Sequence, residues 1–150
     1  MMRLLYASAA RDGLIYRDVL SIAQVASEKN AKVGVTGALC FGGGAFLQAL
    51  EGERSAVNDI YRKIAQDARH TGCEILSADA ITTRLFADWS MKMIGWDTVP
   101  TARRRAILQH HTDSMVFTPS AMTGAQAQGF LRELVEVDAL YAAGAFDTTG

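Results

Sequence analysis

The feature that most constrains the fold is an uncharged stretch from Val33 to Leu50, "VGVTGALCFGGGAFLQAL". On length alone it could cross a bilayer as a helix. It contains five glycines, three of them consecutive at 42–44, and these predict two β-strands that are joined by a tight turn. We therefore expect a β-hairpin in this region and no membrane span. The apolar part of the N-terminus ends at Arg11 and Asp12, too early for a signal peptide, so we expect a cytoplasmic protein.

The segments around the hairpin indicate a mixed fold. A strand is expected at 3–8, and apolar residues at helical spacing predict a helix over 15–29. A second helix is expected over 55–65, and strand-like segments follow at 73–81 and 89–96. The resulting order, β-α-β-β-α-β-β, predicts an α+β fold, a ferredoxin-like sandwich with both helices on one face of the sheet. The other face would remain open.

Residues 97–150 are expected to form a helical C-terminal extension to a first domain at 1–96. Two helices are expected, over 101–111 and 120–143. The second has an apolar stripe of Phe130, Leu134, Val137 and Tyr141. This stripe must be buried, either on the open face of the sheet or against another subunit, so we expect a homo-oligomer.

Charge and cysteine content exclude several classes of function. A formal charge of -1 provides no global attraction to nucleic acid or to anionic lipid, and neither partner is expected. The simplest interpretation of Arg103 to Arg105 is a solvated helix face. Cys40 and Cys73 lie within expected strands and lack a metal-binding spacing, so we interpret them as small buried side chains and predict no metal site.

An amide on an expected buried face suggests a binding site. In "AFLQALEGE" strand alternation places Phe46, Gln48 and Leu50 on one side. Because an unsatisfied buried amide costs about 1–3 kcal/mol, either the protein or a ligand must satisfy Gln48. Similar alternation places Tyr6 with Ser8, and the same rule gives Trp89, Met91 and Met93 one shared face on the last strand. If these faces all point at the helices, the polar groups converge in a pocket walled by Ile22 and Ile64.

Each of these residues also has a plainer interpretation. Gln48 could be a core amide that is bonded to nearby backbone, and Tyr6 could be a packing residue. Ile22 and Ile64 could belong to an ordinary core. Residues 67–70 could be a solvated helix end.

Five segments, taken together and in order, favour a specific interpretation. They are Tyr6 in "LLYAS", Asn30 before "GVTGALCF", Gln48 in "FLQALEG", "DARH" at 67–70 and "FADWSM" at 86–91. In order, spacing and placement they resemble the BLUF domain, a blue-light sensor that uses FAD. The resemblance covers residues 1 to about 96.

The resemblance implies that the flavin ring of FAD lies between the two helices, with its polar edge toward the sheet. It implies a photoactive group of Tyr6 and Gln48, with either Trp89 or Met91 beside the amide. The residues that it implies for cofactor binding are Tyr6, Ser8, Ile22, Asn30, Phe46, Gln48, Lys63, Ile64, Asp67, Arg69, His70 and Met91. Of these, Lys63 is expected near the phosphate.

The function that the resemblance implies is a photoreceptor and not an enzyme. Light would rearrange the hydrogen bonds of Tyr6, Gln48 and the flavin, and the signal would pass to a separate downstream protein. Two other classes stay open on the residues alone, a flavin-dependent redox enzyme and a ligand-free ferredoxin-like assembly module. A yellow purified protein would exclude the assembly module, and a reversible red shift under blue light would exclude an ordinary flavoenzyme.

Overall fold

The computed structural model describes residues 1–142, with side chains described as far as residue 140. Its helices and strands, in chain order, are β1 Met2–Ala10, α1 Tyr16–Lys32, β2 Thr36–Gly42, β3 Ala45–Gly52, α2 Arg54–Gln66, β4 His70–Ala80, β5 Lys92–Gly95, α3 Thr101–His111 and α4 Gly124–Ala142. Short 3-10 turns lie at Trp96–Thr98 and Pro119–Ala121.

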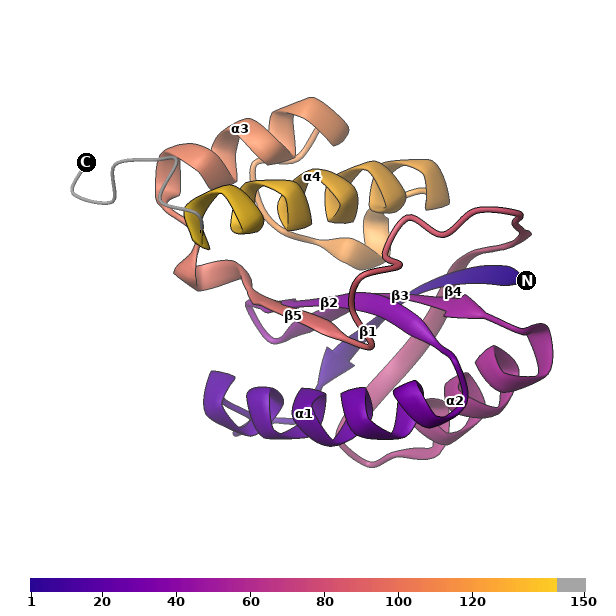
Figure 1. Cartoon of the computed structure of the whole chain (residues 1–150). Helices are drawn as coiled ribbons and strands as arrows, with labels where there is room; N and C mark the ends of the chain where they lie inside the picture. The colour runs from indigo at the N-terminus through magenta and orange to yellow at the C-terminus, as the bar shows by residue number, and fades with distance from the viewer. Residues whose placement is uncertain (143–150) are drawn as a thin grey trace.

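The strands form one five-stranded sheet in the order β4-β1-β3-β2-β5. Strand β1 pairs antiparallel with both β3 and β4, and β2 pairs antiparallel with β3 and parallel with β5. Helices α1 and α2 cover one face of this sheet, while α3 and α4 lie on the other (Figure 1). The prediction of a ferredoxin-like sandwich with a two-helix extension is confirmed.

The predicted hairpin is present as β2 and β3. Gly43 and Gly44 both have positive φ, at 57° and 73°, and these are the two residues of the turn. Two consecutive residues with positive φ are typical of the tight turns that suit twisted strands, and glycine adopts this conformation without a steric penalty. The turn sets a register in which Gln48 lies opposite Leu39 on one side and Tyr6 on the other.

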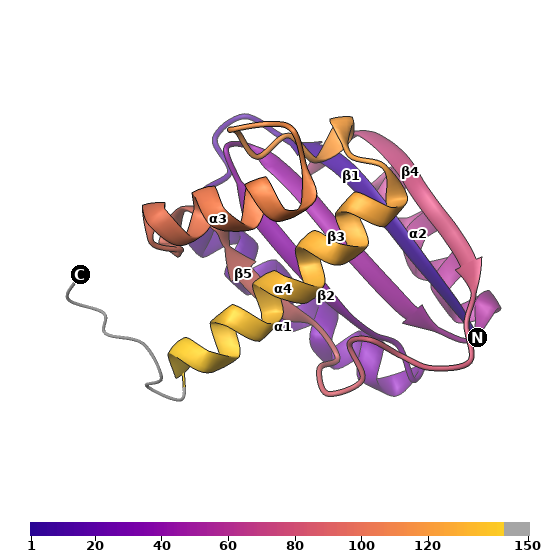
Figure 2. The same ribbon diagram turned by 90° about the horizontal axis from the view of Figure 1, so that it is seen from above.

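Strand alternation separates two apolar clusters on the two faces of the sheet. Leu4, Tyr6, Phe46 and Leu50 belong to the cluster under α1 and α2, which we call the α1/α2 face. The other cluster lies on what we call the tail face, the face over which both views show α3 and α4 (Figures 1 and 2). Its members include Leu5, Leu47, Ala49, Phe130 and Leu134. Phe130 and Leu134 are almost fully buried there. The side chain of Tyr141, the last member of the expected stripe, lies outside the described residues.

The expected strand at 89–96 is shorter than its sequence indicated. Pairing with β2 begins only at Lys92, opposite Ala38, so Trp89 and Met91 precede the strand. Trp89 packs against the cluster on the tail face, whereas Met91 belongs to the cluster on the α1/α2 face. The prediction that these two residues share one face is therefore wrong, because side-chain alternation applies only within a regular strand.

Two other local features refine the expected elements. Helix α4 begins at Gly124, later than residue 120, because Pro119–Ala121 forms a 3-10 turn. Thr123 and Gln126 then exchange backbone-to-side-chain hydrogen bonds of 2.9 and 3.1 Å, which is a capping box. Cys40 is buried, Cys73 is half-buried, and both are free thiols. No helix in the described part of the chain has the length and apolar character that crossing a membrane would require.

Candidate functional site

A cavity of about 490 Å³ lies between α1 and α2, with Gln48 of β3 among its lining residues. Helix α1 contributes Ser21, Ile22, Val25, Ala26, Lys29 and Asn30. Helix α2 contributes Ala56, Asp59, Ile60, Lys63 and Ile64, and Val33, Asp67, Arg69 and His70 complete the lining. Both helical sets recur every three or four residues, so each helix turns one stripe toward the cavity.

The amide of Gln48 is the central polar group beneath this cavity. Its Oε1 accepts a hydrogen bond from the Tyr6 hydroxyl, and its Nε2 donates to the Met91 sulfur at 3.2 Å. The side chain is nearly buried, and Tyr6 is fully buried. A carboxamide carries two N–H donors and one acceptor oxygen. The protein therefore uses the acceptor and one donor, which leaves the second N–H for a ligand in the cavity.

The Tyr6 phenol is kept in its protonated form by its surroundings. Burial is the main cause that raises the pKa of this hydroxyl well above its usual value, and nearby Cys73, Tyr61 and Asp67 raise it further. The Tyr61 ring meets the Tyr6 ring edge-on, with centroids 5.3 Å apart. The Tyr6 hydroxyl therefore remains a neutral phenol and directs its proton at Gln48 Oε1.

Ser8 and Phe46 lie beside His70 at one end of the site. Ser8 Oγ is 2.8 Å from His70 Nδ1, and the Phe46 and His70 rings have centroids 4.4 Å apart. Burial lowers the pKa of His70, with Asp67 opposing this effect and Arg69 adding to it. His70 is therefore neutral at neutral pH and presents a ring to the cavity.

Asn30 joins α1 to the segment before β5. This buried residue donates from its side-chain Nδ2 to the Ser90 carbonyl at 3.2 Å. Its backbone carbonyl accepts the Val35 amide at 2.9 Å. It also lines the cavity. The side-chain oxygen of Asn30, Oδ1, takes part in neither contact and can accept a hydrogen bond from a ligand.

Charged groups lie on the rim of the cavity. Arg69 bonds both carboxylate oxygens of Asp67 through its side chain. These hydrogen bonds are the main cause that lowers the pKa of Asp67 to about 2. Lys29 and Lys63 lie on the exposed cavity wall, one on each helix. The rim therefore carries three cations against two carboxylates, Asp59 and Asp67, which suits an anionic group such as a phosphate.

The structure brings together most of the residues that the sequence named. Eight of them line the cavity, namely Ile22, Asn30, Gln48, Lys63, Ile64, Asp67, Arg69 and His70. Tyr6, Ser8, Phe46 and Met91 are buried directly beneath or beside them. Trp89 is not in this group, since its side chain packs on the tail face. Met91 is thus the residue beside Gln48.

Several lining residues were not predicted as binding residues. Ala26 and Ile60 were visible only as members of apolar helix stripes, and Lys29 and Asp59 were not assigned a binding role. The available signal was helical spacing, because Ala26 and Lys29 fall four and seven residues after Ile22. Apolar stripes usually face a core, so spacing alone could not distinguish a cavity wall from a packed interior.

These residues fit a flavin. Ile22 and Ile64 offer apolar walls from opposite helices to a flat ring. Gln48 and Asn30 offer unused donor and acceptor positions to its polar edge. Cavities of this size with few placed polar groups are typical of cofactor sites.

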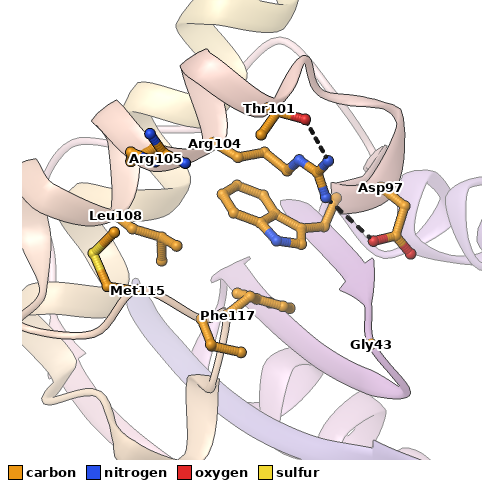
Figure 3. A pocket seen from close by; sticks show the side chains of 10 residues that line it. Gly43, Asp97, Thr101, Arg104, Arg105, Leu108, Met115 and Phe117 are labelled. Atoms are coloured by element: carbon orange, nitrogen blue, oxygen red, sulfur yellow. Dashed lines mark hydrogen bonds and ion pairs between the residues drawn. The ribbon is translucent and has the colours of Figure 1, made fainter.

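A second cavity, of about 470 Å³, lies on the other side of the molecule, around the N-terminal part of α3 (Figure 3). Arg104 reaches across it to Thr101 at 3.1 Å and to Asp97 at 3.7 Å. Leu108, Met115 and Phe117 supply most of its apolar wall together with Trp96. Neither Gln48 nor Tyr6 lines this cavity, so it offers a flavin no photoactive contact.

The comparison with family models gives one match, described as "BLUF: Sensors of blue-light using FAD", over residues 1–92. Among curated proteins, the chain is 36% identical over 90 residues to the blue light- and temperature-regulated antirepressor BluF of Escherichia coli K12, covering 60% of this chain and 22% of that protein. It is 34% identical over 80 residues to photoactivated adenylate cyclase subunit beta of Euglena gracilis, covering 53% of this chain and 9% of that protein. The chain thus spans less than a quarter of the length of these relatives.

Solved structures cover more of the chain. BlsA in its photo-activated state matches with a TM-score of 0.78 at 28% identity, over 89% of this chain and 94% of that one. BlrB, described as a BLUF protein in its dark state, matches with a TM-score of 0.72 at 26% identity, over 91% and 96% of the two chains. Both matches extend beyond residue 92 and therefore include part of the tail.

Proposed function

The chain belongs to the BLUF family of blue-light sensors, and from this premise we propose that it binds FAD between α1 and α2 and reads light through Tyr6, Gln48 and Met91. The observation that carries the proposal is the position of the Gln48 amide, which bridges the Tyr6 hydroxyl and the Met91 sulfur beneath the cavity. When bound, a flavin supplies blue-light absorption and an excited state that takes up one electron.

The chain's own residues then determine the response to absorbed light. Tyr6 holds a proton directed at Gln48 Oε1 and can release it together with an electron. Rotation or tautomerisation of the Gln48 amide exchanges its donor and acceptor ends, and the transferred proton and electron return to Tyr6. Tyr6 and the flavin thus end in their original redox and protonation states, but the hydrogen bonds of Gln48 differ from those in the dark.

Met91 converts this exchange into a change of packing. A thioether sulfur can accept a hydrogen bond but cannot donate one. If rotation turns the amide oxygen toward Met91, the contact at 3.2 Å loses its donor. Each altered bond is worth only about 1 kcal/mol, so the signal requires a segment near balance between two packings. We assign this role to the segment before β5.

The remaining functional assignments belong to the same proposal. Residues 1–96 form the flavin domain, and residues 97–150 form an extension that transmits the signal. We propose that the output passes to a separate protein through contacts, without catalysis by this chain, and that the chain acts as a homo-oligomer. Support comes from α3 and α4, which pack directly on the sheet that carries Gln48. The outer cofactor contacts are assigned to Lys63, Asp67, Arg69 and His70.

The first test is the identity and behaviour of the pigment. Protein expressed with ample flavin should be yellow, release FAD on denaturation, and show a reversible red shift under blue light. Tyr6→Phe should retain the pigment and lose the shift, because the phenol is the only group in the assignment that supplies both an electron and a proton. Release of FMN would correct only the choice of flavin. Protein without flavin, or a full shift in Tyr6→Phe, would contradict the proposal.

A further inference from the structure

Glu51 is a buried carboxylate that the proposed photochemistry does not use. It lies on β3, three residues after Gln48, and its side chain points to the opposite face of the sheet with no exposed surface. Its Oε2 accepts hydrogen bonds from Arg3 Nε at 2.8 Å and from the Leu85 amide at 2.9 Å. Its Oε1 accepts the Phe86 amide at 2.7 Å.

This set of donors suits a carboxylate. An ionised carboxylate is acceptor-only, so it can receive three N–H groups without presenting a competing donor. Burial of such a charge is costly unless it is both paired and hydrogen-bonded, and here Arg3 supplies the pair. The two backbone amides belong to residues 81–91, which contain neither helix nor strand. Glu51 therefore fixes an irregular segment that has no regular pairing of its own.

The segment held by Glu51 leads directly to the photoactive group. After Phe86, the Trp89 carbonyl accepts the Gly37 amide at 3.1 Å, and the Ser90 carbonyl accepts Asn30 Nδ2 at 3.2 Å. The next residue is Met91, whose sulfur accepts the Gln48 amide. Residues 85–91 are thus anchored by Glu51 at one end and by Gln48 at the other, and both anchors are on β3.

Arg3 extends the same network to the tail. Its Nη2 donates to the Thr83 carbonyl, and its Nη1 donates to Gln128 Oε1 on α4, each at 3.3 Å. Because Glu51 holds both the 85–91 segment and Arg3, a displacement of the segment would also change the Arg3 contact with α4.

We propose that Glu51 is a positioning residue for the light response: by holding Leu85 and Phe86 it places Met91 beside Gln48 and sets the rate at which the dark arrangement returns. This rests on the proposed function. In the dark, the anchored segment presents the sulfur to the amide. After light, the anchor at Glu51 persists and returns Met91 to the same position.

The test is a double-mutant cycle on the rate of dark recovery, followed by flavin absorption after a blue flash. Glu51→Gln replaces one accepting oxygen by an NH₂ group that faces a donor, which releases the segment at constant size. Recovery should slow by about tenfold, the effect of roughly one hydrogen bond. In a Met91→Leu background the same substitution should change the recovery rate by less than about twofold. Glu51 is proposed to act by placing the Met91 sulfur, and that sulfur is already absent from this background.

A matched control separates positioning from loss of stability. Ile107 is buried on α3, outside the hydrogen bonds of Glu51. Ile107→Val or Ile107→Ala, whichever matches the melting temperature of Glu51→Gln, should leave the recovery rate unchanged. An equal slowing in this control would overturn the inference. The inference would also be overturned if Glu51→Gln left the recovery rate of the otherwise unmutated protein unchanged. The same holds if Glu51→Gln slowed recovery equally with Met91 and with Leu at position 91.

A measurement on the unmutated protein covers the case in which Glu51→Gln fails to fold. The amides of Leu85 and Phe86 should exchange hydrogen in the dark as slowly as central strand amides, although their backbone is irregular. Fast exchange at both would overturn the inference. If the unmutated protein binds no flavin or shows no shift, the proposed function fails and this inference fails with it. A normal photocycle without an effect of Glu51 overturns the inference alone.

Discussion

Gln48 and Glu51, buried on opposite faces of the sheet, differ in how far the protein satisfies them. On the α1/α2 face, the Gln48 amide is only partly satisfied by the protein, and exposed apolar residues such as Val25 and Val33 line the cavity next to it. On the tail face, the buried Glu51 carboxylate receives hydrogen bonds from Arg3 and from the backbone amides of Leu85 and Phe86. An incompletely satisfied polar group beside an open cavity indicates a ligand, whereas a fully satisfied one indicates a structural or positioning role.

The side chains that surround the two cavities also differ. On the tail face, Trp96, Phe117 and Phe130 form a continuous aromatic group with centroids 5.3–5.5 Å apart. On the α1/α2 face, Ile22 and Ile64 are only half-buried and face the cavity. Truncation of Phe130, which is fully buried, should therefore cost more folding stability than truncation of the half-buried Ile22, whereas pigment properties should depend on the α1/α2 face.

The largest expected effect is on the pigment. Gln48→Leu removes the group that connects Tyr6 to Met91, so the light-induced shift should disappear while the yellow colour remains. Difference absorption spectroscopy before and after blue light measures the loss. Gln109→Leu makes the same chemical change at an exposed position of α3 and should keep the full shift. A normal shift in Gln48→Leu would remove the central distinction between the faces.

A smaller effect is expected on folding from the tail face. Phe130→Ala deletes a fully buried ring from the aromatic group and should lower the free energy of unfolding by about 3–5 kcal/mol. Urea unfolding measures the change. The absorption maximum of the bound flavin should stay in place, because Phe130 lies on the other side of the sheet. If Ile22→Ala destabilised the flavin-free protein as strongly, the expected difference between Phe130 and Ile22 would be wrong.

The smallest expected effect concerns pH. Burial lowers the pKa of His70 in the folded state, so below pH about 6.5 the unfolded chain binds a proton that the folded chain does not. Stability should therefore fall as the pH decreases through this value, by at most about 1.4 kcal/mol per unit. Unfolding measured from pH 7 to pH 5 should show this slope in the wild type and a reduced slope in His70→Gln. Equal slopes would show that His70 is not the titrating group.

Much of the fold could be predicted from local rules. The hairpin followed from Gly42 to Gly44, because consecutive glycines suit a turn with positive φ. The placement of Tyr6 and Gln48 on one face followed from strand alternation, since both lie well inside regular strands. The clustering of eight named residues around one cavity could not follow from alternation alone, and came from a resemblance that was carried by five ordered motifs.

Where the chain is irregular, the sequence did not determine the structure. The alternation rule gave Trp89 and Met91 one face, but the segment that contains them is positioned by contacts with distant residues, namely Gly37, Asn30 and Glu51. Such contacts bring together groups 35 to 60 residues apart, and no local periodicity encodes them. The sequence by itself therefore determined the two faces and the residue types that they bury. Only the tertiary structure decided that Met91, and not Trp89, meets Gln48, because the position of an irregular segment depends on the groups available to satisfy its backbone.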